Sequence, residues 1–259
     1  NFDYTRSGNP NFSILENVLK GIENSNYCTV FNSGISAVTA IVSSLKSGDT
    51  ILCESNLYGC TIRMFEKIFR KFGIQTSYFD FTNKEYIQQI SKVKPSLIWL
   101  ESPTNPLLKI LNLKEICSEA NLRKIPVVVD NTFCTAVIQK PLELGATLSL
   151  ISTTKFINGH SDALGGAVIT NDESWNNKMI FSQKSLGLNP SPFDCWLITR
   201  GLKTLPLRIA QQTENAHFIA NELNSHKLID QLIYPFNKNH PQFELAKSQM
   251  KIGGSMITL

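Results

Sequence analysis

Short apolar runs alternate with segments of helical period through most of this chain, and this alternation constrains the fold more than any other feature. The runs are rich in valine, isoleucine and leucine, which predicts strands at residues 28–31, 50–53, 75–79, 96–100, 127–129, 147–151 and 165–170. Apolar strands separated by helices are typical of a mainly parallel sheet that is covered by helices on both faces. We therefore predict an α/β fold.

Apolar residues at helical spacing predict helices at residues 14–21, 35–45, 61–72, 84–92, 113–122, 175–186, 193–202 and 207–223. Residues 1–13 are polar, aromatic and rich in turn residues, so we expect an extended arm there. We assign residues 14–205 to a large α/β domain and residues 206–259 to a linking helix and the start of a smaller α/β domain. Because the chain begins without methionine and stops within a strand-like run, we expect the protein to continue at both ends.

Composition excludes several classes of protein. The 259 residues include 42% apolar and 18% charged residues, which is typical of a folded domain in solution. The net charge of +4 comes from scattered lysines and arginines, so we expect no nucleic-acid partner. The six cysteines form no Cys-x-x-Cys pair and the four histidines have no ligand spacing, which argues against a metal site and favours the reducing cytoplasm. We find neither a membrane span nor a signal peptide.

Polar residues follow three of the predicted strands. Glu101 and Asp130 come directly after apolar runs, and Lys155 lies just beyond the next run. Ligands of parallel α/β sheets bind at the carboxyl ends of the strands. We therefore expect these three side chains to contribute to one site.

Lys155 has two hydroxyl side chains close to it in sequence. Ser152 precedes it by three residues and Thr154 by one residue. Hydroxyl donors beside an amine suit a phosphate next to a lysine-bound aldehyde, which suggests pyridoxal phosphate (PLP) as cofactor. The alternative is a solvated surface lysine, which is what most lysines are.

Three further residues fit the same cofactor, each with a plainer alternative. Asp130 could hold the proton on the pyridine nitrogen, or it could be a helix cap or part of a buried ion pair. Gly34 is at the start of a predicted helix whose free N–H groups could bind phosphate. The alternative is an ordinary helix start that binds no anion. The ring of Tyr58 could stack on a cofactor or pack in the core.

These stretches together resemble the PLP-dependent enzymes of cysteine and methionine metabolism, which include cystathionine γ-synthase, cystathionine γ-lyase and methionine γ-lyase. The similar motifs occur in the family's order and are YTRSGNP (4–10), SGISA (33–37), YGCT (58–61), ESPTNP (101–106), DNTF (130–133), STTKFINGHSD (152–162), SPFDCW (191–196) and RGLKTL (200–205). The resemblance implies the fold type I of PLP-dependent transferases, with a mostly parallel seven-stranded sheet.

The resemblance also implies roles. Lys155 is similar to the Schiff-base lysine, Asp130 to the partner of the pyridine nitrogen, and Tyr58 to a tyrosine that stacks on the ring and assists proton transfer. The phosphate would be bound by the backbone N–H groups of Gly34 and Ile35 and by the hydroxyls of Ser152 and Thr154.

Four more residues are assigned through the resemblance. Tyr4 and Arg6 would reach the phosphate in a neighbouring subunit, which implies a homodimer or homotetramer with shared active sites. Asn105 would lie near the phenolic oxygen of the cofactor. Glu101 would also lie close to the cofactor. We assign Glu101 and Arg63 to substrate binding.

The resemblance implies γ-replacement or γ-elimination on small amino acids. Arg63 is similar to an arginine that binds the distal carboxylate of cystathionine or of an O-acylhomoserine, although an exposed arginine on a helix is the alternative. Cys60 favours methionine γ-lyase, and O-acetylhomoserine sulfhydrylase is a further candidate. A catalytically inactive scaffold is the alternative of another class. The family's arginine for the substrate α-carboxylate would lie beyond Leu259.

Overall fold

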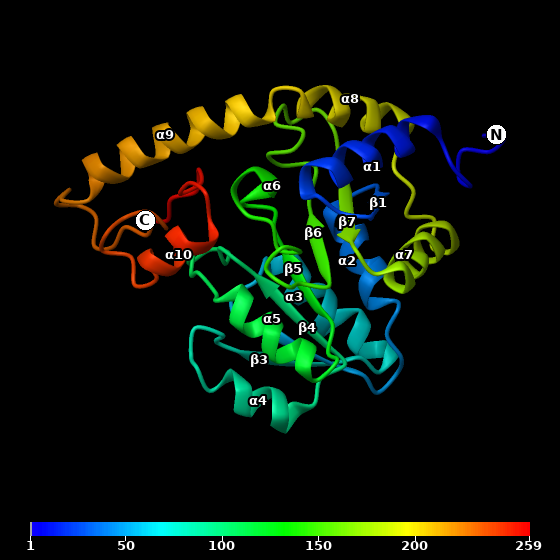
Figure 1. Cartoon of the computed structure of the whole chain (residues 1–259), viewed down its shortest axis with the longest axis horizontal. Coiled ribbons are helices and arrows are strands. Elements are labelled where there is room, and N and C mark those ends of the chain that lie inside the picture. The colour runs from blue at the N-terminus through cyan, green and yellow to red at the C-terminus, as the bar shows by residue number, and fades with distance from the viewer. Residues whose placement is uncertain (1) are drawn as a thin grey trace.

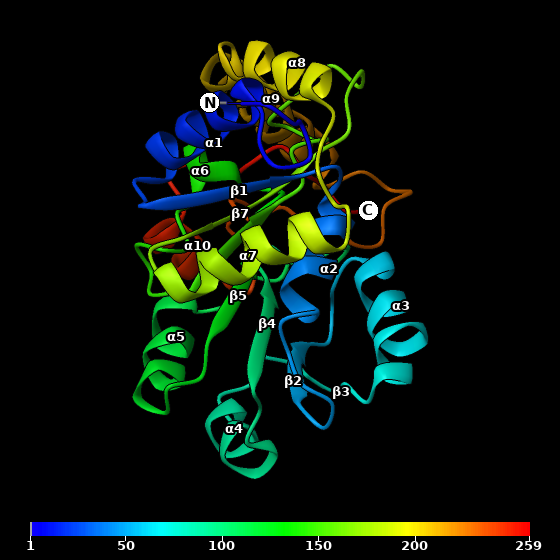
Figure 2. The ribbon, with the colours of Figure 1, turned by 90° about the vertical axis from the view of Figure 1, so that its right-hand side faces the viewer.

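The computed structural model describes residues 2–259 and contains a seven-stranded sheet with helices on both faces (Figures 1 and 2). The strands are β1 (Tyr27–Phe31), β2 (Thr50–Glu54), β3 (Gln75–Phe79), β4 (Leu97–Glu101), β5 (Val127–Asp130), β6 (Leu148–Ile151) and β7 (Gly166–Thr170). Every predicted strand forms, and its ends lie within about one residue of the prediction. All strands except β3, at the edge of the sheet, are largely buried, which is why their sequences are apolar.

The strand order is β1-β7-β6-β5-β4-β2-β3. The pairs from β3 to β6 are parallel, whereas β7 is antiparallel to both β6 and β1. Strand β1 therefore runs in the same direction as β6. It follows that β1, β2, β4, β5 and β6 all end at the same edge of the sheet, which we call the carboxyl edge. The prediction of a mostly parallel sheet is confirmed.

The helices are α1 (Pro10–Glu23), α2 (Gly34–Val42), α3 (Gly59–Lys67), α4 (Tyr86–Val93), α5 (Leu113–Leu122), α6 (Thr135–Ile138), α7 (Glu173–Ser185), α8 (Pro192–Leu202), α9 (Leu205–Leu223) and α10 (Phe243–Gln249), with a 3₁₀ turn η1 at Phe69–Phe72. One face of the sheet packs against α2, α3 and α7. The other packs against α1 and α8 at the β1 side and against α4 and α5 towards β2. Alternate residues of β5 and β6 point into the two layers, so both faces are buried.

Five helices differ from the predictions. The helix predicted at residues 35–45 ends at Val42, and the one predicted at residues 61–72 is divided into α3 and η1. Helix α1 begins four residues early because the Asn9 side chain accepts a hydrogen bond from the Asn11 N–H and Pro10 is preset for the first helical position. It also continues through Gly21 to a left-handed Asn24. The short helices α6 and α10 carry too few residues to show a period in the sequence.

The last part of the chain follows the long helix α9, which extends away from the sheet (Figure 1). A small cluster of Ala216, Ala220 and Tyr234 packs beneath it. The strand-like run at the end forms a single bridge, from Ile233 to Thr258. The division into an arm, a large domain and the start of a smaller domain stays a prediction. Across residues 2–259, no helix combines the length and apolar character that crossing a membrane requires.

Candidate active site

The carboxyl edge brings most of the predicted site residues together. Glu101 ends β4 and Asp130 ends β5, and the two are direct partners in the register of the sheet. The Glu101 carboxylate accepts a hydrogen bond of 2.8 Å from the backbone N–H of Tyr58, the residue before α3. Residues that are far apart in sequence are therefore neighbours here, as expected for ends of parallel strands.

Thr132 connects Asp130 to the segment that carries Lys155. Its N–H donates to the Asp130 carboxylate at 3.0 Å, and its hydroxyl accepts from the Ser152 N–H at 2.9 Å. The Lys155 N–H in turn donates to the Ser152 carbonyl at 3.3 Å. The lysine thus begins a tight turn that is anchored next to Asp130. The sequence analysis did not single out Thr132, although it lies within the DNTF motif.

The two carboxyl groups at this edge are buried among apolar strands. Burial raises the pKa of Asp130, and hydrogen bonds from Thr132 partly oppose that shift. Burial also raises the pKa of Glu101 to well above its usual range, and the neighbouring Asp130 charge adds to the effect. Both shifts favour the protonated carboxyl, so a negative charge at this edge needs a partner that stabilises it. Within residues 2–259, no lysine, arginine or histidine forms an ion pair with Asp130.

This arrangement fits the ring of PLP. A buried carboxylate without a cation is costly, and a protonated pyridine nitrogen would supply the missing positive charge. Asp130 could then ionise at neutral pH, because an opposite charge lowers the pKa of a carboxyl group.

The start of α2 fits the phosphate. Ser33 caps the helix by accepting from the Ser36 N–H at 3.1 Å, and the first intrahelical hydrogen bond runs from Ala37 to Ser33. The N–H groups of Gly34 and Ile35 precede that bond and are therefore free for an anion. Gly34 also lies against Ser152, since a Cβ at Gly34 would be 2.9 Å from the Ser152 Cβ. The phosphate end of the site is thus adjacent to the Lys155 turn.

Thr154 is placed differently from the expected phosphate donor. Its hydroxyl donates to the Gly165 carbonyl at 3.1 Å and accepts from the Gly165 N–H at 3.0 Å. These bonds fasten the Lys155 turn to the start of β7. The Thr154 assignment therefore stays a prediction, and Ser152 is the hydroxyl closer to the helix start.

Tyr58 and Arg63 are linked through a residue between them. The Arg63 guanidinium donates to the Cys60 thiol at 3.9 Å. A hydrogen bond with Cys60 raises the pKa of Tyr58, and partial burial adds to the shift. Tyr58 is nevertheless 41% exposed, so its ring is available for stacking on a ligand. The three side chains form one polar face at the start of α3.

The remaining predicted residues differ in how closely they join this edge. Asn105 is half-buried in the loop that follows β4. Tyr4 and Arg6 contact each other, with a distance of 3.3 Å between the guanidinium and the phenol oxygen. Arg6 also contacts the segment between α7 and α8, through the Lys184 carbonyl and the Asn189 side chain. The structure does not bring Tyr4 or Arg6 to Lys155 of the same chain.

Two surface hollows lie away from these residues. One of about 530 Å³ lies between the end of α2 and α7, and one of about 260 Å³ lies between residues 160–162 and the end of α8. Neither is lined by a residue assigned above. We place the candidate active site at the carboxyl edge, because buried carboxyl groups and the lysine turn meet there. Within residues 2–259, no three histidine, cysteine, aspartate or glutamate side chains form a metal-binding group.

Comparison with known proteins shows the family to which the chain belongs. The profile of the Cys/Met metabolism PLP-dependent enzymes matches residues 1–259. The chain belongs to this family. It is 40% identical to a probable cystathionine γ-synthase of Herpetosiphon aurantiacus over all of this chain and 81% of that protein. It is 41% identical to the cystathionine γ-lyase of Dictyostelium discoideum over 99% of this chain and 66% of that protein.

A solved structure also resembles the chain closely. The cystathionine γ-synthase of Xanthomonas oryzae pv. oryzae, in complex with aminoacrylate and cysteine, superimposes with a TM-score of 0.96 at 37% identity. The match covers 98% of this chain and 66% of that chain. The predicted fold and the membership of a PLP-dependent family are thus confirmed, and the chain spans about two thirds of the length of two of these relatives.

Proposed function

We propose that the protein catalyses γ-replacement or γ-elimination on cystathionine or an O-acylhomoserine, with PLP bound to Lys155. One observation carries this proposal: a buried Asp130 carboxyl that lacks a cation is joined, through Thr132 and Ser152, to the turn that begins at Lys155. A surface lysine and a structural ion pair were the plainer alternatives, and neither accounts for that connection. The relatives named above support the class of reaction.

The residues would divide the work as follows. When bound, PLP supplies an aldehyde for the lysine amine and a protonated ring that accepts electron density from the substrate Cα. Asp130 holds the proton on the ring nitrogen. The Lys155 amine, once displaced by the substrate amine, can remove the Cα proton and carry protons between substrate atoms. Gly34, Ile35 and Ser152 bind the phosphate.

The substrate side chain would lie along the start of α3. The Arg63 guanidinium binds the distal carboxylate, and the Cys60 thiol orients it. The Tyr58 phenol, which shares the same thiol, stays protonated at neutral pH and can donate a proton to the leaving group. Buried Glu101 accepts a hydrogen bond from the Tyr58 backbone, which makes it a support of the substrate site.

We also propose that active sites are shared in a homodimer or a homotetramer. Tyr4 and Arg6 lie on an exposed arm and contact each other and the last turn of α7, which leaves them accessible to a second copy. The six cysteines are all free, which supports a cytoplasmic location.

Cofactor binding can be tested directly on the intact protein. Incubation with PLP should produce a visible absorbance band, and borohydride reduction followed by peptide mass spectrometry should place the added mass on Lys155. Turnover of cystathionine, O-succinylhomoserine with cysteine, O-acetylhomoserine with sulfide, and methionine would then separate the members of the family. A protein that never takes up PLP would favour the scaffold alternative.

Substituting Arg63 with alanine tests the substrate assignment. We expect the KM for cystathionine and O-succinylhomoserine to rise about 10- to 100-fold, because a charge-assisted hydrogen bond contributes about 1.5–3 kcal/mol. Methionine has no distal carboxylate, so its KM should stay near the wild-type value. Arg70→Ala is the matched control, since Arg70 is exposed and pairs only with Glu66 on its own helical segment. Equal effects on methionine and cystathionine would remove the reason for preferring cystathionine chemistry.

A further inference from the structure

Arg208 lies in the first turn of α9, and its guanidinium reaches the segment directly after Lys155. Nη1 donates to the Phe156 carbonyl at 2.7 Å, and Nη2 donates to the Ile157 carbonyl at 3.1 Å. One side chain, about fifty residues away in sequence, thus binds the first two carbonyl groups that follow the lysine.

The same guanidinium binds the junction between α8 and α9. Nη2 also donates to the Gly201 carbonyl at 2.9 Å, and Nε donates to the Thr204 hydroxyl at 3.1 Å. Within residues 2–259, Arg208 forms no ion pair with a carboxylate. Its positive charge is therefore directed at carbonyl groups, and such charge-assisted hydrogen bonds are about twice as strong as neutral ones.

Two glycines allow the segment after Lys155 to approach this junction. Gly159 has a φ of 76°, and a Cβ there would be 2.0 Å from Nη1 of Arg208. Gly201 lies so close to the Asn158 carbonyl that a Cβ would be 2.2 Å from its oxygen. A side chain at Gly201 would push the two segments apart, because it would meet backbone, whereas a side chain at Gly159 would displace the Arg208 guanidinium and strain a left-handed residue. Both glycines therefore favour the contact with Arg208.

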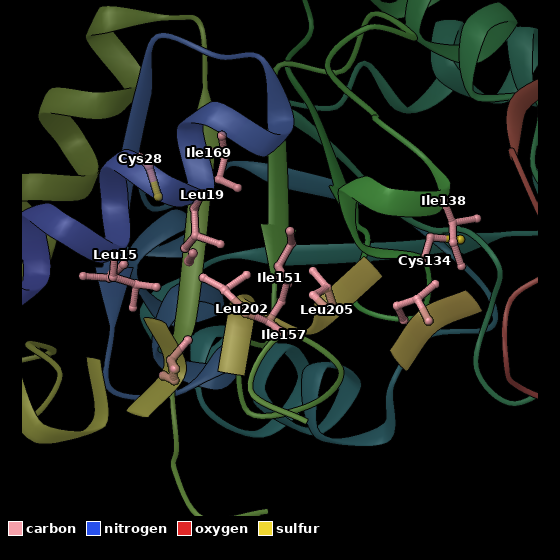
Figure 3. Close-up of a cluster of buried hydrophobic side chains, with 14 of the residues drawn as sticks. Leu15, Leu19, Cys28, Cys134, Ile138, Ile151, Ile157, Ile169, Leu202 and Leu205 are labelled. Carbon is pink, nitrogen blue, oxygen red and sulfur yellow. The ribbon is translucent and has the colours of Figure 1, made fainter. Parts of the chain in front are cut away.

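Hydrophobic packing supports the same contact. Ile157 is fully buried in the cluster that also contains Leu202, Leu205 and Ile209. Figure 3 shows Ile157 beside Leu202 and Leu205, below Ile151 of β6. The segment after Lys155 is thus held both by apolar contacts and by Arg208.

We propose that Arg208 is a positioning residue that fixes residues 156–159 and thereby directs the Lys155 amine towards Asp130. This inference rests on the proposed role of Lys155. The turn is fastened on its other side by Thr154 and Gly165, so Arg208 completes a clamp around the lysine. The amine lies at the end of a long, exposed side chain, and its aim depends on the backbone that carries it. A displacement of about 1 Å at such a group can lower a rate about 100-fold.

A purely structural clamp, which holds α9 on the domain without affecting the lysine, is the alternative. It predicts changes in stability only. The proposal also predicts a shift in the pH midpoint of the visible absorbance band of the PLP-loaded protein. In addition, it predicts a lower kcat with little change in KM.

The experiment compares Arg208→Ala, Arg208→Lys and Thr204→Val with wild type and with Arg200→Ala as control, all as full-length protein. Arg200 is a suitable control because it is exposed and lies at the same end of α8. Hydrogen exchange of residues 154–160 is measured with and without PLP. The pH midpoint of the visible band, kcat and KM are measured on the PLP-loaded proteins.

We expect Arg208→Ala to accelerate exchange at residues 156–159 by about 10-fold or more, to shift the pH midpoint of the visible band, and to lower kcat about 10- to 100-fold. Arg208→Lys, which keeps the charge but not the forked donors, should recover part of each effect. Arg200→Ala should behave like wild type.

Two results would overturn the inference. One is a folded Arg208→Ala protein with wild-type exchange at residues 156–159, and the other is faster exchange with an unchanged pH midpoint and an unchanged kcat. Should Arg208→Ala fail to fold, Thr204→Val removes the acceptor of Nε, together with the hydrogen bond of 3.2 Å from the Thr204 hydroxyl to the Gly201 carbonyl, and leaves the other Arg208 contacts in place. It must show the same changes to a smaller degree, and wild-type values would contradict the inference. If wild type binds no PLP, the proposed function fails, and so does a role for Arg208 in directing Lys155. Exchange without PLP would then show only whether Arg208 holds the loop.

Discussion

Lys155→Ala is expected to abolish covalent retention of PLP and to lower turnover by about 1,000-fold or more, since one amine acts both as the cofactor's attachment point and as the base. The variant should fold normally, because Lys155 is exposed and its backbone hydrogen bonds to Ser152 and Gly159 do not involve the side chain. Borohydride reduction followed by gel filtration and mass spectrometry would measure the loss of the bound cofactor.

Two controls sharpen this result. Lys155→Arg keeps the positive charge, yet guanidinium neither forms the bond to an aldehyde nor loses its proton at working pH, so it should be as inactive as the alanine variant. Lys203→Ala removes an exposed lysine at the α8–α9 junction and should retain PLP normally. Stable retention of reduced PLP by Lys155→Ala would mean that another lysine binds the cofactor.

Most of the sheet could be predicted from the sequence because every strand except β3, at its edge, is largely buried. The strand Val127–Asp130 has no solvent-exposed face, so an unbroken run of apolar residues shows where it lies in the sequence. Short helices carry no such signal. Helix α6 has four residues, and its position depends on the turn that Asn131 and Thr135 form after β5, where the Thr135 N–H donates to the Asn131 carbonyl at 2.8 Å.

The site could be predicted only as far as the strand ends specify it. Position after a strand locates Glu101, Asp130 and Lys155 at one edge, whatever their loops do. The path of a loop decides which hydroxyl remains free, and sequence does not reveal that path. Thr154 is hydrogen-bonded to Gly165, and its assignment to the phosphate stays a prediction. Thr132 forms a connection that spacing does not indicate.

The contacts of Arg208 could not be predicted from the sequence either, because they also depend on the path of a loop. Its RGLKTL neighbourhood was noticed only as a motif, since an arginine on a helix is usually exposed. Its four hydrogen bonds form where Gly159 and Gly201 let two distant segments approach each other. Long-range contacts of this kind depend on packing, which periodicity does not encode.

Asp130→Asn is expected to lower kcat about 100- to 10,000-fold, because an amide cannot hold the proton on the ring nitrogen through a negative charge. The free energy of unfolding of the cofactor-free Asp130→Asn protein, in contrast, should not fall below that of wild type at high pH. Burial raises the pKa of Asp130 in the folded protein, so the folded state binds the proton more tightly than the unfolded state. Stability of the cofactor-free wild type therefore falls as pH rises from the usual aspartate pKa through the raised one, and asparagine removes that loss.

The two effects separate a cofactor partner from a structural carboxylate. Above that pH window, cofactor-free Asp130→Asn should unfold at a temperature equal to or higher than wild type, while its PLP-loaded form is nearly inactive. Asp172→Asn is the matched control: it makes the same substitution after β7, at the opposite edge of the sheet, where asparagine caps α7 as well as aspartate does. A cofactor-free Asp130→Asn protein that is strongly destabilised at high pH would show that the ionised carboxylate supports the fold itself, and the assignment of its charge to a pyridine nitrogen would then be wrong.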